Sequence, residues 1–545
     1  MKKALLKSLV LFVALSFGLA KVNAQSFTYG DLNYEVNYDG VSVTVLDHVL
    51  GNDATGTLTI PEYAVYNGNS YAVTIIDSYA FAYCHGLTGT LVLPNTLEEI
   101  GDDAFSYCGF TGVVNIPASV EYIGYTPFYC CYGIEGFVVD PANEDYDSRD
   151  NCNAIIKSYN DELIIGCKNS TIPNGVESIG EDAFNHCTGL TSITIPSSVT
   201  SIEGWSFWFT GLTSITIPSS VTYIGENPFG GCAALEEILV EEGNPNYDSR
   251  NGCNAIVRTS NDELIVGCQN TVIPDDVTRI GNDAFYYCSN LTGELVIPEN
   301  ITSIGEYAFE HCSGLTGSLL IPNTVLELGE SAFAYCSGFN GTLTLSEALT
   351  FIGGWTFEEC PGFTGSLVIP DAVRTIGSSA FEGCRGFDGT LTLSKSLTHI
   401  ESFAFASCES FREAVVLAEE PPTLGSYSFG GFGSTTLVVP CGCVSVYENS
   451  DWHEQFTNIV EDCTTVLEAE NHSAAVYPNP TYGRVTIEAE GIHNISIYNL
   501  LGEKVFESPA NSNVFEYDFS GMEKGLYLIR IATDKGFSTK IVTLM

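Results

Sequence analysis

The sequence contains few basic residues for its length. Its 20 lysines and arginines face 67 aspartates and glutamates, which gives a formal charge of −47 at pH 7. A surface of this sign repels phosphate backbones and anionic lipid headgroups. The imbalance therefore excludes nucleic acid as a partner, whereas it suits a large protein that has to stay soluble.

Long apolar runs are also missing. Beyond the N-terminus no stretch reaches roughly 18 uninterrupted apolar residues, the length that a transmembrane helix requires. Residues 1–24 combine a positive start with Lys2, Lys3 and Lys7, an apolar run over 9–19 and the small-residue end Val22-Asn-Ala24. This order is typical of a secretory signal peptide. We therefore expect an exported chain with no transmembrane helix.

Catalytic motifs are absent as well. The sequence has no GxSxG, HExxH, phosphate-binding loop or dinucleotide-binding glycine pattern in the context that each chemistry requires. Its eight histidines are scattered along the chain. We therefore predict that the protein is not an enzyme and that it uses no cofactor and no metal ion.

What the sequence does contain is a repeated phrase. A phenylalanine is followed by a cysteine three residues on, then Gly-Leu-Thr or Gly-Phe-Thr, a short apolar run ending in proline, and Ile-Gly. A period of about 20 to 29 residues with this leucine and isoleucine spacing predicts a leucine-rich-repeat solenoid, whose coils bury one continuous core. The repeat phenylalanines are Phe81, Phe105, Phe128, Phe184, Phe207, Phe229, Phe285, Phe309, Phe333, Phe357, Phe381 and Phe405.

Alternation within a coil predicts one strand. Over Leu190–Ile195 the side chains of Ile193 and Ile195 fall on one face, and serine and threonine fall on the other. We expect the isoleucines to point inward. Ile202 then begins the return path and points back to the core.

The phrase IGxxAFxxCxxLTxxxIP resembles the BspA-like branch of leucine-rich repeats, found in surface proteins of gut and oral anaerobes and of some protists. The resemblance covers roughly residues 26–462. It implies a solenoid that adheres to host proteins or to other cells.

The last 70 residues have a different pattern, in which short alternating strands are separated by glycine, proline and asparagine turns. This pattern predicts a small β-sandwich. It is similar to the C-terminal sorting domain of type IX secretion in Bacteroidetes-type bacteria, which implies export across the outer membrane, followed by attachment to the cell surface or release. A carbohydrate-binding sandwich is the alternative. The motif residues are Tyr477, Pro478, Asn479, Pro480, Gly483, Gly502, Gly525, Tyr527 and Lys540.

The chain is therefore predicted to be mainly β, a leucine-rich-repeat solenoid followed by a small β-sandwich. The segments without the phrase at either end of the array are expected to cap its open edges. The predicted divisions are a signal peptide (1–24), an N-terminal cap (25–75), the repeats (76–412, with inserts over 140–173 and 241–274), a C-terminal cap (413–463), a linker (464–475) and the sorting domain (476–545).

Cysteines fall into two groups. Eleven of the 19 lie three residues after a repeat phenylalanine, where a small, weakly polar side chain suits a packed turn. Buried thiols are the main interpretation of this column, with bonds between neighbouring coils or a metal ladder as alternatives. One further bond can join two of Cys441, Cys443 and Cys463.

The two inserts are copies of each other. If Lys157 faces Glu162 across a four-residue turn, Cys152 lies opposite Cys167, which makes this pair a candidate disulfide in an exported protein. The same register pairs Cys253 with Cys268. Both inserts open with acidic turns around Asp145 and Asp248. Such oxygen-rich turns either hold calcium or bond their own backbone, and they lack the glycine and closing glutamate of an EF-hand.

Two surfaces are candidates for recognition. One is the outward face of the strands, which is nearly uncharged and is equally explained by β-propensity. The other is a row of aromatic residues directly before the repeat cysteines, which either anchors a ligand or only packs between coils. From this row, which also contains His186 and Phe209, we select Tyr83, Tyr107, Tyr287, His311 and Tyr335 as candidate binding residues.

The favoured function is adhesion to a protein of a host or of another bacterium. The alternatives are a glycan-binding surface protein and a passive coat component. The sequence cannot choose a ligand, because a repeat scaffold leaves specificity to its outward residues.

Overall fold

The computed structural model describes residues 25–432, 434–463, 474–499, 504–522, 524–533 and 536–545. These residues form two units, which we describe separately. The first holds residues 25–412 and 423–432, and the second holds 413–422 and the described residues from 434 onward. The predicted signal peptide, most of the predicted linker and Gly502 lie outside the described residues. No described helix has the length and apolar character needed to cross a membrane.

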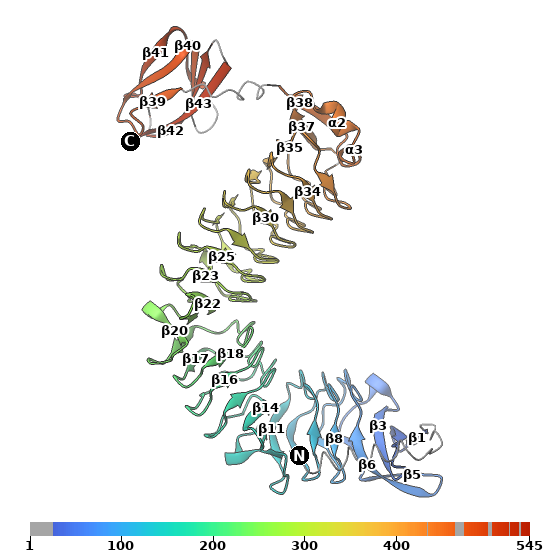
Figure 1. Ribbon diagram of the computed structural model, residues 1–545. Coiled ribbons are helices and arrows are strands. Elements are labelled where there is room, and N and C mark those ends of the chain that lie inside the picture. The colour runs from blue at the N-terminus through green and yellow to red at the C-terminus, as the bar shows by residue number, and fades with distance from the viewer. Residues whose placement is uncertain (1–24, 433, 464–473, 500–503, 523, 534–535) are drawn as a thin grey trace, which may run out of the picture. The chain divides into compact units, whose positions relative to one another are not determined.

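The first unit is the predicted solenoid, and its coils follow one another as stacked turns (Figure 1). Most coils contribute two short strands, each paired in parallel with the next coil, where the sequence predicted only one. The second strand is the dipeptide before Ile-Gly, as at Ser201–Ile202, so Ile202 both points inward and extends a ladder.

The strands at this second position are β8 (Glu99–Ile100), β10 (Tyr122–Ile123), β15 (Ser178–Ile179), β16 (Ser201–Ile202), β18 (Tyr223–Ile224), β23 (Arg279–Ile280), β25 (Ser303–Ile304), β28 (Glu327–Leu328), β30 (Phe351–Ile352), β32 (Thr375–Ile376), β34 (His399–Ile400) and β36 (Thr423–Leu424). The strands at the first position are β4 (Leu58–Thr59), β7 (Leu91–Val92), β9 (Gly112–Ile116), β11 (Ile134–Val139), β17 (Ser214–Ile217), β19 (Glu237–Val240), β24 (Gly293–Glu294), β26 (Leu315–Thr316), β27 (Leu319–Leu320), β29 (Leu343–Thr344), β31 (Leu367–Val368) and β33 (Thr390–Leu393).

One predicted strand is wrong. Residues 190–195 form no strand, and Ile193 is only half-buried. The parallel ladder at this position stops at β11 and resumes at β17, on either side of the first insert. The insert therefore separates this coil from the partner that its strand would need.

Stacked phenylalanine rings form the centre of the core. The ring of Phe333 lies 5.1 Å from Phe309 and 5.7 Å from Phe357, centre to centre, with all three planes nearly parallel. The side chain of Phe333 is fully buried. Stacking of this kind adds about 0.5–1.5 kcal/mol per pair to the free energy gained by burial. The stack is interrupted only where an insert parts two coils, between Phe128 and Phe184 and between Phe229 and Phe285.

The repeat cysteines are free thiols. Beyond filling a small space, they link coils: the Sγ–H of Cys336 donates to the carbonyl oxygen of Phe309 at 3.0 Å, and Cys360 does the same to Phe333 at 3.0 Å. Burial raises the pKa of Cys384 to about 12, which keeps that thiol protonated. The column therefore contributes packing and hydrogen bonds between coils.

The N-terminal cap is a sheet that continues into the first coils. Its strands bury Tyr34, Val43 and Val73 against the first repeat. They are β1 (Ser26–Tyr29), β2 (Leu32–Val36), β3 (Ser42–His48), β5 (Tyr63–Tyr66) and β6 (Asn69–Ile76), with a 3-10 turn η1 at Gly51–Asp53.

The inserts fold as predicted hairpins, but their disulfides do not form. Lys157 pairs with Glu162 in the register, and their side chains form an ion pair of 2.8 Å. A bulge between Ile155 and Ile156 then shifts the register by one residue, so Cys152 no longer faces Cys167. All four insert cysteines, Cys152, Cys167, Cys253 and Cys268, are buried free thiols.

The elements of the first insert are β12 (Tyr146–Asp147), η2 (Arg149–Asn151), β13 (Ile155–Lys157) and β14 (Glu162–Ile165). Those of the second are β20 (Tyr247–Asp248), η3 (Arg250–Gly252), β21 (Ile256–Arg258) and β22 (Glu263–Val266).

The second unit begins with the C-terminal cap. Its strands β35 (Glu413–Val416), β37 (Thr436–Pro440) and β38 (Asn458–Asp462) are accompanied by the helices α2 (Val444–Glu448) and α3 (Trp452–Gln455). Cys441 and Cys463 are joined by a disulfide, which settles the partners that the sequence left open.

The C-terminal domain is an antiparallel β region around its own apolar core. The long strand β40 pairs with three neighbours, and hydrogen bonds from Thr481 and Met545 bring the first and last strands together. All five strands therefore belong to one sheet. The strands are β39 (Ala475–Tyr477), β40 (Arg484–Tyr498), β41 (Lys504–Asp518), β42 (Gly525–Thr533) and β43 (Gly536–Leu544).

Candidate functional site

The predicted aromatic row is a ladder of neighbouring rings on one side of the solenoid, some stacked face to face and some edge to face. Ring centres lie 4.8 Å apart between Tyr83 and Tyr107, 4.0 Å between Tyr287 and His311, and 4.5 Å between His311 and Tyr335. Tyr83 is 51% exposed and Tyr335 is 36% exposed. The five candidate residues therefore share one surface, although they span more than 250 residues of sequence.

Sequence reasoning missed one member of this ladder, Tyr129. The expected position in that coil is Cys130, but the ring of Tyr129 bridges the gap, 5.3 Å from Tyr107 and 5.2 Å from His186. The only available signal was an aromatic residue one position early, in a coil where cysteine takes the usual place. The aromatic ladder thus comprises Tyr83, Tyr107, Tyr129, His186, Phe209, Tyr287, His311 and Tyr335.

A cavity of about 480 Å³ opens beside the ladder at the first insert, and we call it the first-insert cavity. In a regular coil, the N–H of the ladder residue donates to a carbonyl of the next coil, as from Tyr107 to Tyr129. Among the described residues, the N–H of Cys130 has no such bond to the coil of Phe184. Six tyrosines surround the resulting opening: Tyr122, Tyr125, Tyr129, Tyr132, Tyr146 and Tyr159.

The second insert closes the corresponding space. Gly230 and Gly231 replace Tyr129 and Cys130, and the N–H of Gly231 donates to the carbonyl of Tyr286 at 3.1 Å. A Cβ on Gly231 would come within 2.8 Å of the Phe209 ring, which lies across this glycine and reaches Tyr287. The remaining space measures about 10 Å³. The two inserts are therefore alike in sequence but differ in the cavity beside them.

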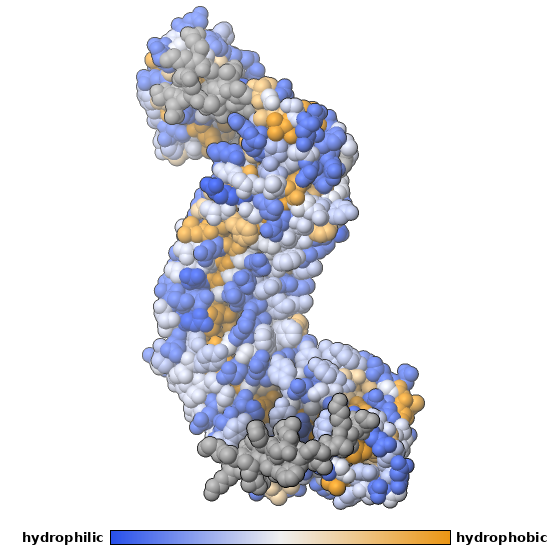
Figure 2. Space-filling view, turned by 45° about the vertical axis from the view of Figure 1, so that its right-hand side comes forward, coloured by the Kyte–Doolittle hydropathy of each residue, from blue (hydrophilic) through white to orange (hydrophobic). Residues whose placement is uncertain are grey.

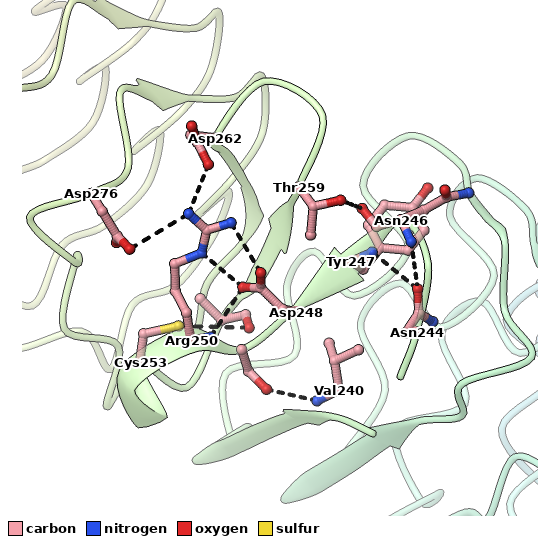
Figure 3. A network of polar contacts seen from close by, with 12 residues as sticks. Val240, Asn244, Asn246, Tyr247, Asp248, Arg250, Cys253, Thr259, Asp262 and Asp276 are labelled. Atoms are coloured by element: carbon pink, nitrogen blue, oxygen red, sulfur yellow. Dashed lines mark hydrogen bonds and ion pairs between the residues drawn. The ribbon is translucent and has the colours of Figure 1, made fainter. Parts of the chain in front are cut away.

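The acidic turns of the inserts are engaged by arginine. Figure 3 shows Arg250 between Asp248 and Asp262, with N–O distances of 2.9 Å and 2.7 Å, and Asp276 at 3.6 Å. Asn244 accepts backbone N–H groups at the start of the turn. In the first insert, Arg149 holds Asp147 and Asp161 in the same way. These contacts support the interpretation of the acidic residues as turn-forming.

Two carboxyl groups close to the ladder have raised pKa values. Burial raises the pKa of Asp283 to about 7, with Glu226 and Glu306 adding to the effect. Burial also raises the pKa of Glu310 to about 7, helped by Asp283 and Glu358. At pH 7 each of these two carboxyl groups is therefore partly protonated in the folded protein.

This acidity predicts a pH dependence of stability. Both pKa values are raised on folding, so the folded protein retains protons that the unfolded chain releases between about pH 4 and pH 7. The stabilisation is complete below about pH 4 and is lost as the pH rises through 7, at about 1 kcal/mol per group after solvent screening. We expect the melting temperature of the full chain to be a few degrees higher at about pH 5.5 than at about pH 8, measured by circular dichroism.

The double variant Asp283→Asn/Glu310→Gln isolates this effect from the repulsion of the whole acidic surface. It should lose most of the difference between the two pH values, whereas Asp388→Asn, a change at an exposed residue, should keep it. An unchanged difference in the double variant would show that other groups are responsible.

The outward strand face offers a weaker candidate site. Thr90, Val92, Val113 and Asn115 are exposed there, as predicted. Figure 2 shows small groups of hydrophobic residues between hydrophilic ones on the face that it presents. The outward strand face therefore presents both polar and apolar side chains.

The sorting-motif residues lie mostly at one end of the C-terminal sheet. Asn479 binds β43 through the carbonyl of Ile541 and the N–H of Thr543. The buried ring of Tyr527 packs 5.1 Å from Phe519. The others have these places: Tyr477 is exposed and donates to Glu488, Pro478 and Pro480 follow cis peptide bonds, Gly483 donates to Thr481, Gly525 begins β42, and Lys540 is exposed on β43.

Two protein families match the chain. The BspA type leucine-rich repeat region matches in six copies over residues 69–152, 155–252, 265–388 and 356–450. The secretion system C-terminal sorting domain matches residues 475–544. Neither family is in general enzymatic. No curated protein matches the chain.

Several solved structures are similar in fold. A leucine-rich cell surface protein from Faecalibacterium prausnitzii is 25% identical and covers 73% of this chain and 96% of its own, with a TM-score of 0.45. A leucine-rich repeat protein from Eubacterium ventriosum is 18% identical and covers 75% and 95%, with a TM-score of 0.45. One from Bacteroides ovatus is 20% identical and covers 80% and 99%, with a TM-score of 0.35.

Proposed function

The chain belongs to the BspA-type leucine-rich-repeat family, and we propose that it is a surface adhesin whose aromatic ladder binds a protein of a host or of another bacterium. Its C-terminal domain is a sorting domain that directs secretion to the cell surface, where the solenoid meets other cells. The type IX secretion machinery is the partner of that domain.

The continuity of the ladder carries the proposal. Eight rings from eight coils lie in one row, and the tyrosines at its two ends are the most exposed. Aromatic anchors dominate the binding energy of protein interfaces, because they bury a large area at little entropic cost. The stack also holds each ring in a fixed orientation before the partner arrives, which reduces the cost of binding.

Replacing Tyr287 and Tyr335 together with alanine tests this function. We expect cells that display the full chain to lose at least about tenfold of their attachment to immobilised mucosal protein, since each anchor of this kind contributes about 1–2 kcal/mol. Tyr223→Ala is the control, because Tyr223 is 52% exposed, against 36% for Tyr335, and lies on β18, outside the ladder. Undiminished attachment of the double variant would show that the ladder does not mediate adhesion.

Glycan binding is the second candidate, and the first-insert cavity favours it. Tyrosine rings stack on sugar faces, and the cavity also offers polar groups such as Lys157, Glu162 and Lys168. A glycan array with the full chain separates the two functions. Selective signals that Tyr129→Ala abolishes, together with unchanged attachment to protein in the ladder variant, would favour the glycan.

A further inference from the structure

A second hollow is lined by residues of the coils from Phe184 to Phe309, and we call it the acidic–aromatic cleft. It measures about 390 Å³, and its main lining residues are Asp182, Trp205, Trp208, Glu226, Asp283 and Tyr286. Most of these side chains come from two repeated positions, two residues before and one residue after the repeat phenylalanine. Two of the four tryptophans of the chain are therefore gathered in one place.

The hollow exists because one coil has no side chain where its neighbours have large ones. Trp208 and Tyr286 occupy the position after the repeat phenylalanine in the coils of Phe207 and Phe285. Between them the same position is Gly230, where a Cβ would come within 2.1 Å of the Asn227 side chain. The glycine therefore leaves room for the Asn227 side chain, which lines the cleft between Trp208 and Tyr286.

The charge of the cleft is uncompensated. Asp182, Glu226 and Asp283 all line it, and within the described ranges none of them forms an ion pair with lysine or arginine. In the inserts, by contrast, Asp161 faces Arg149 and Asp262 faces Arg250. The cleft therefore gathers carboxylates without the arginine that accompanies the clustered carboxylates of the inserts.

The cleft also contains polar atoms without a partner. The Nε1–H of Trp208 and the Oδ1 of Asn185 are buried and form no hydrogen bond. A buried polar atom of this kind costs about 1–3 kcal/mol, which a ligand with a matching group recovers. Oδ1 accepts hydrogen bonds, as do the three carboxylates of the lining, whereas the Nε1–H of Trp208 is a donor.

We propose that the acidic–aromatic cleft binds an arginine side chain of a partner protein. The guanidinium stacks on an indole ring of Trp205 or Trp208 and donates to the carboxylates of Glu226 and Asp283 and to the Oδ1 of Asn185. Arginine fits better than lysine, because its planar group stacks on aromatic rings, carries five donors in a fixed fork and is weakly hydrated. The proposal rests on the proposed function, since it supplies the chemistry of one contact in a protein interface.

Isothermal titration of the full chain with the peptide acetyl-Gly-Arg-Gly-amide tests the cleft. The matched probe replaces arginine with citrulline, which has nearly the same shape but no charge. We expect the arginine peptide to bind at least about tenfold more tightly than the citrulline peptide, because a charge-assisted bond is roughly twice as strong as a neutral one. Glu226→Gln/Asp283→Asn should weaken the arginine peptide at least about tenfold, and Trp205→Ala should do the same.

The repeat supplies control variants at equivalent positions. Asp103→Asn and Trp355→Ala change residues two positions before a repeat phenylalanine, as Asp283 and Trp205 are, but they lie outside the cleft. Both should bind the peptide normally. Equal binding of the two peptides, full binding by the cleft variants, or heat from calcium chloride alone would overturn the proposal.

The outcome is distinguishable from that of the adhesion experiment. If peptide binding fails while the Tyr287→Ala/Tyr335→Ala variant still loses attachment, the cleft proposal is wrong and the adhesin function stands. If the peptide binds and the ladder variant attaches fully, the arginine site stands and the ladder does not mediate adhesion.

Discussion

Replacing Phe333 with alanine is expected to lower the free energy of unfolding by about 4 kcal/mol. The ring is fully buried and stacks on Phe309 and Phe357, so its removal leaves a cavity and breaks two ring contacts. Substitutions of buried phenylalanine by alanine cost about 3–5 kcal/mol. Urea unfolding of the full chain, followed by circular dichroism, measures the effect.

The position of Phe333 in the middle of the array adds a second expectation. In a repeat protein each coil contacts mainly its neighbours, so a weak coil separates the two sides of the array. We expect hydrogen exchange to speed up most in the coils of Phe309, Phe333 and Phe357. Phe351→Ala is the control, because Phe351 is 44% exposed and its loss should cost less than about 1 kcal/mol. Equal costs for the two variants would show that the stacked rings do not stabilise the solenoid.

Replacing Trp452 with alanine is expected to destabilise the C-terminal cap to a similar degree. The indole is fully buried, lies 5.4 Å from Tyr447 and 5.9 Å from Phe456, and donates from Nε1 to the carbonyl of Pro422 at 2.8 Å. Its loss should cost about 3–5 kcal/mol. Because the disulfide between Cys441 and Cys463 remains, we expect the cap to open locally.

Hydrogen exchange of residues 436–463 in the full chain checks this prediction. Trp452→Phe is the graded control, since it keeps an aromatic ring in the packed site and loses the hydrogen bond and part of the indole volume, at about 1–2 kcal/mol. The phenylalanine variant should therefore lie much closer to the unchanged protein than the alanine variant. A cap that stays protected after Trp452→Ala would mean that α2, α3 and the disulfide hold it without the indole.

Much of the fold could be predicted because the same residue types recur at fixed positions in successive coils. A phenylalanine and a cysteine at fixed positions in each coil predict a stacked core, and Phe333 and Cys336 are fully buried. The features that the sequence did not predict are contacts between coils. The second strand at Ser201–Ile202 has only two residues, which is too short for alternation to mark it, and it exists because the next coil supplies its partner.

The predicted disulfides of the inserts are absent for a related reason. The turn register at Lys157 was predicted correctly, but a single bulge changes which residues face each other beyond it. Sequence does not mark such a bulge, because it depends on how the hairpin packs on the next coil. Cys441 and Cys463 do form a disulfide, since their Cα atoms lie 4.5 Å apart in the cap.

The sequence by itself determined the sorting domain, the repeat and the row of aromatic residues, because each of these depends on residue type and spacing along the chain. Only the tertiary structure decided which neighbouring coils pack together and which leave a cavity between them. The two inserts are near copies, yet Gly230 and Gly231 let one pair of coils meet, while Tyr129 and Cys130 leave the other apart. The physical reason is that a cavity in a solenoid depends on the fit between two coils, and the residues that decide this fit lie on separate turns of the chain.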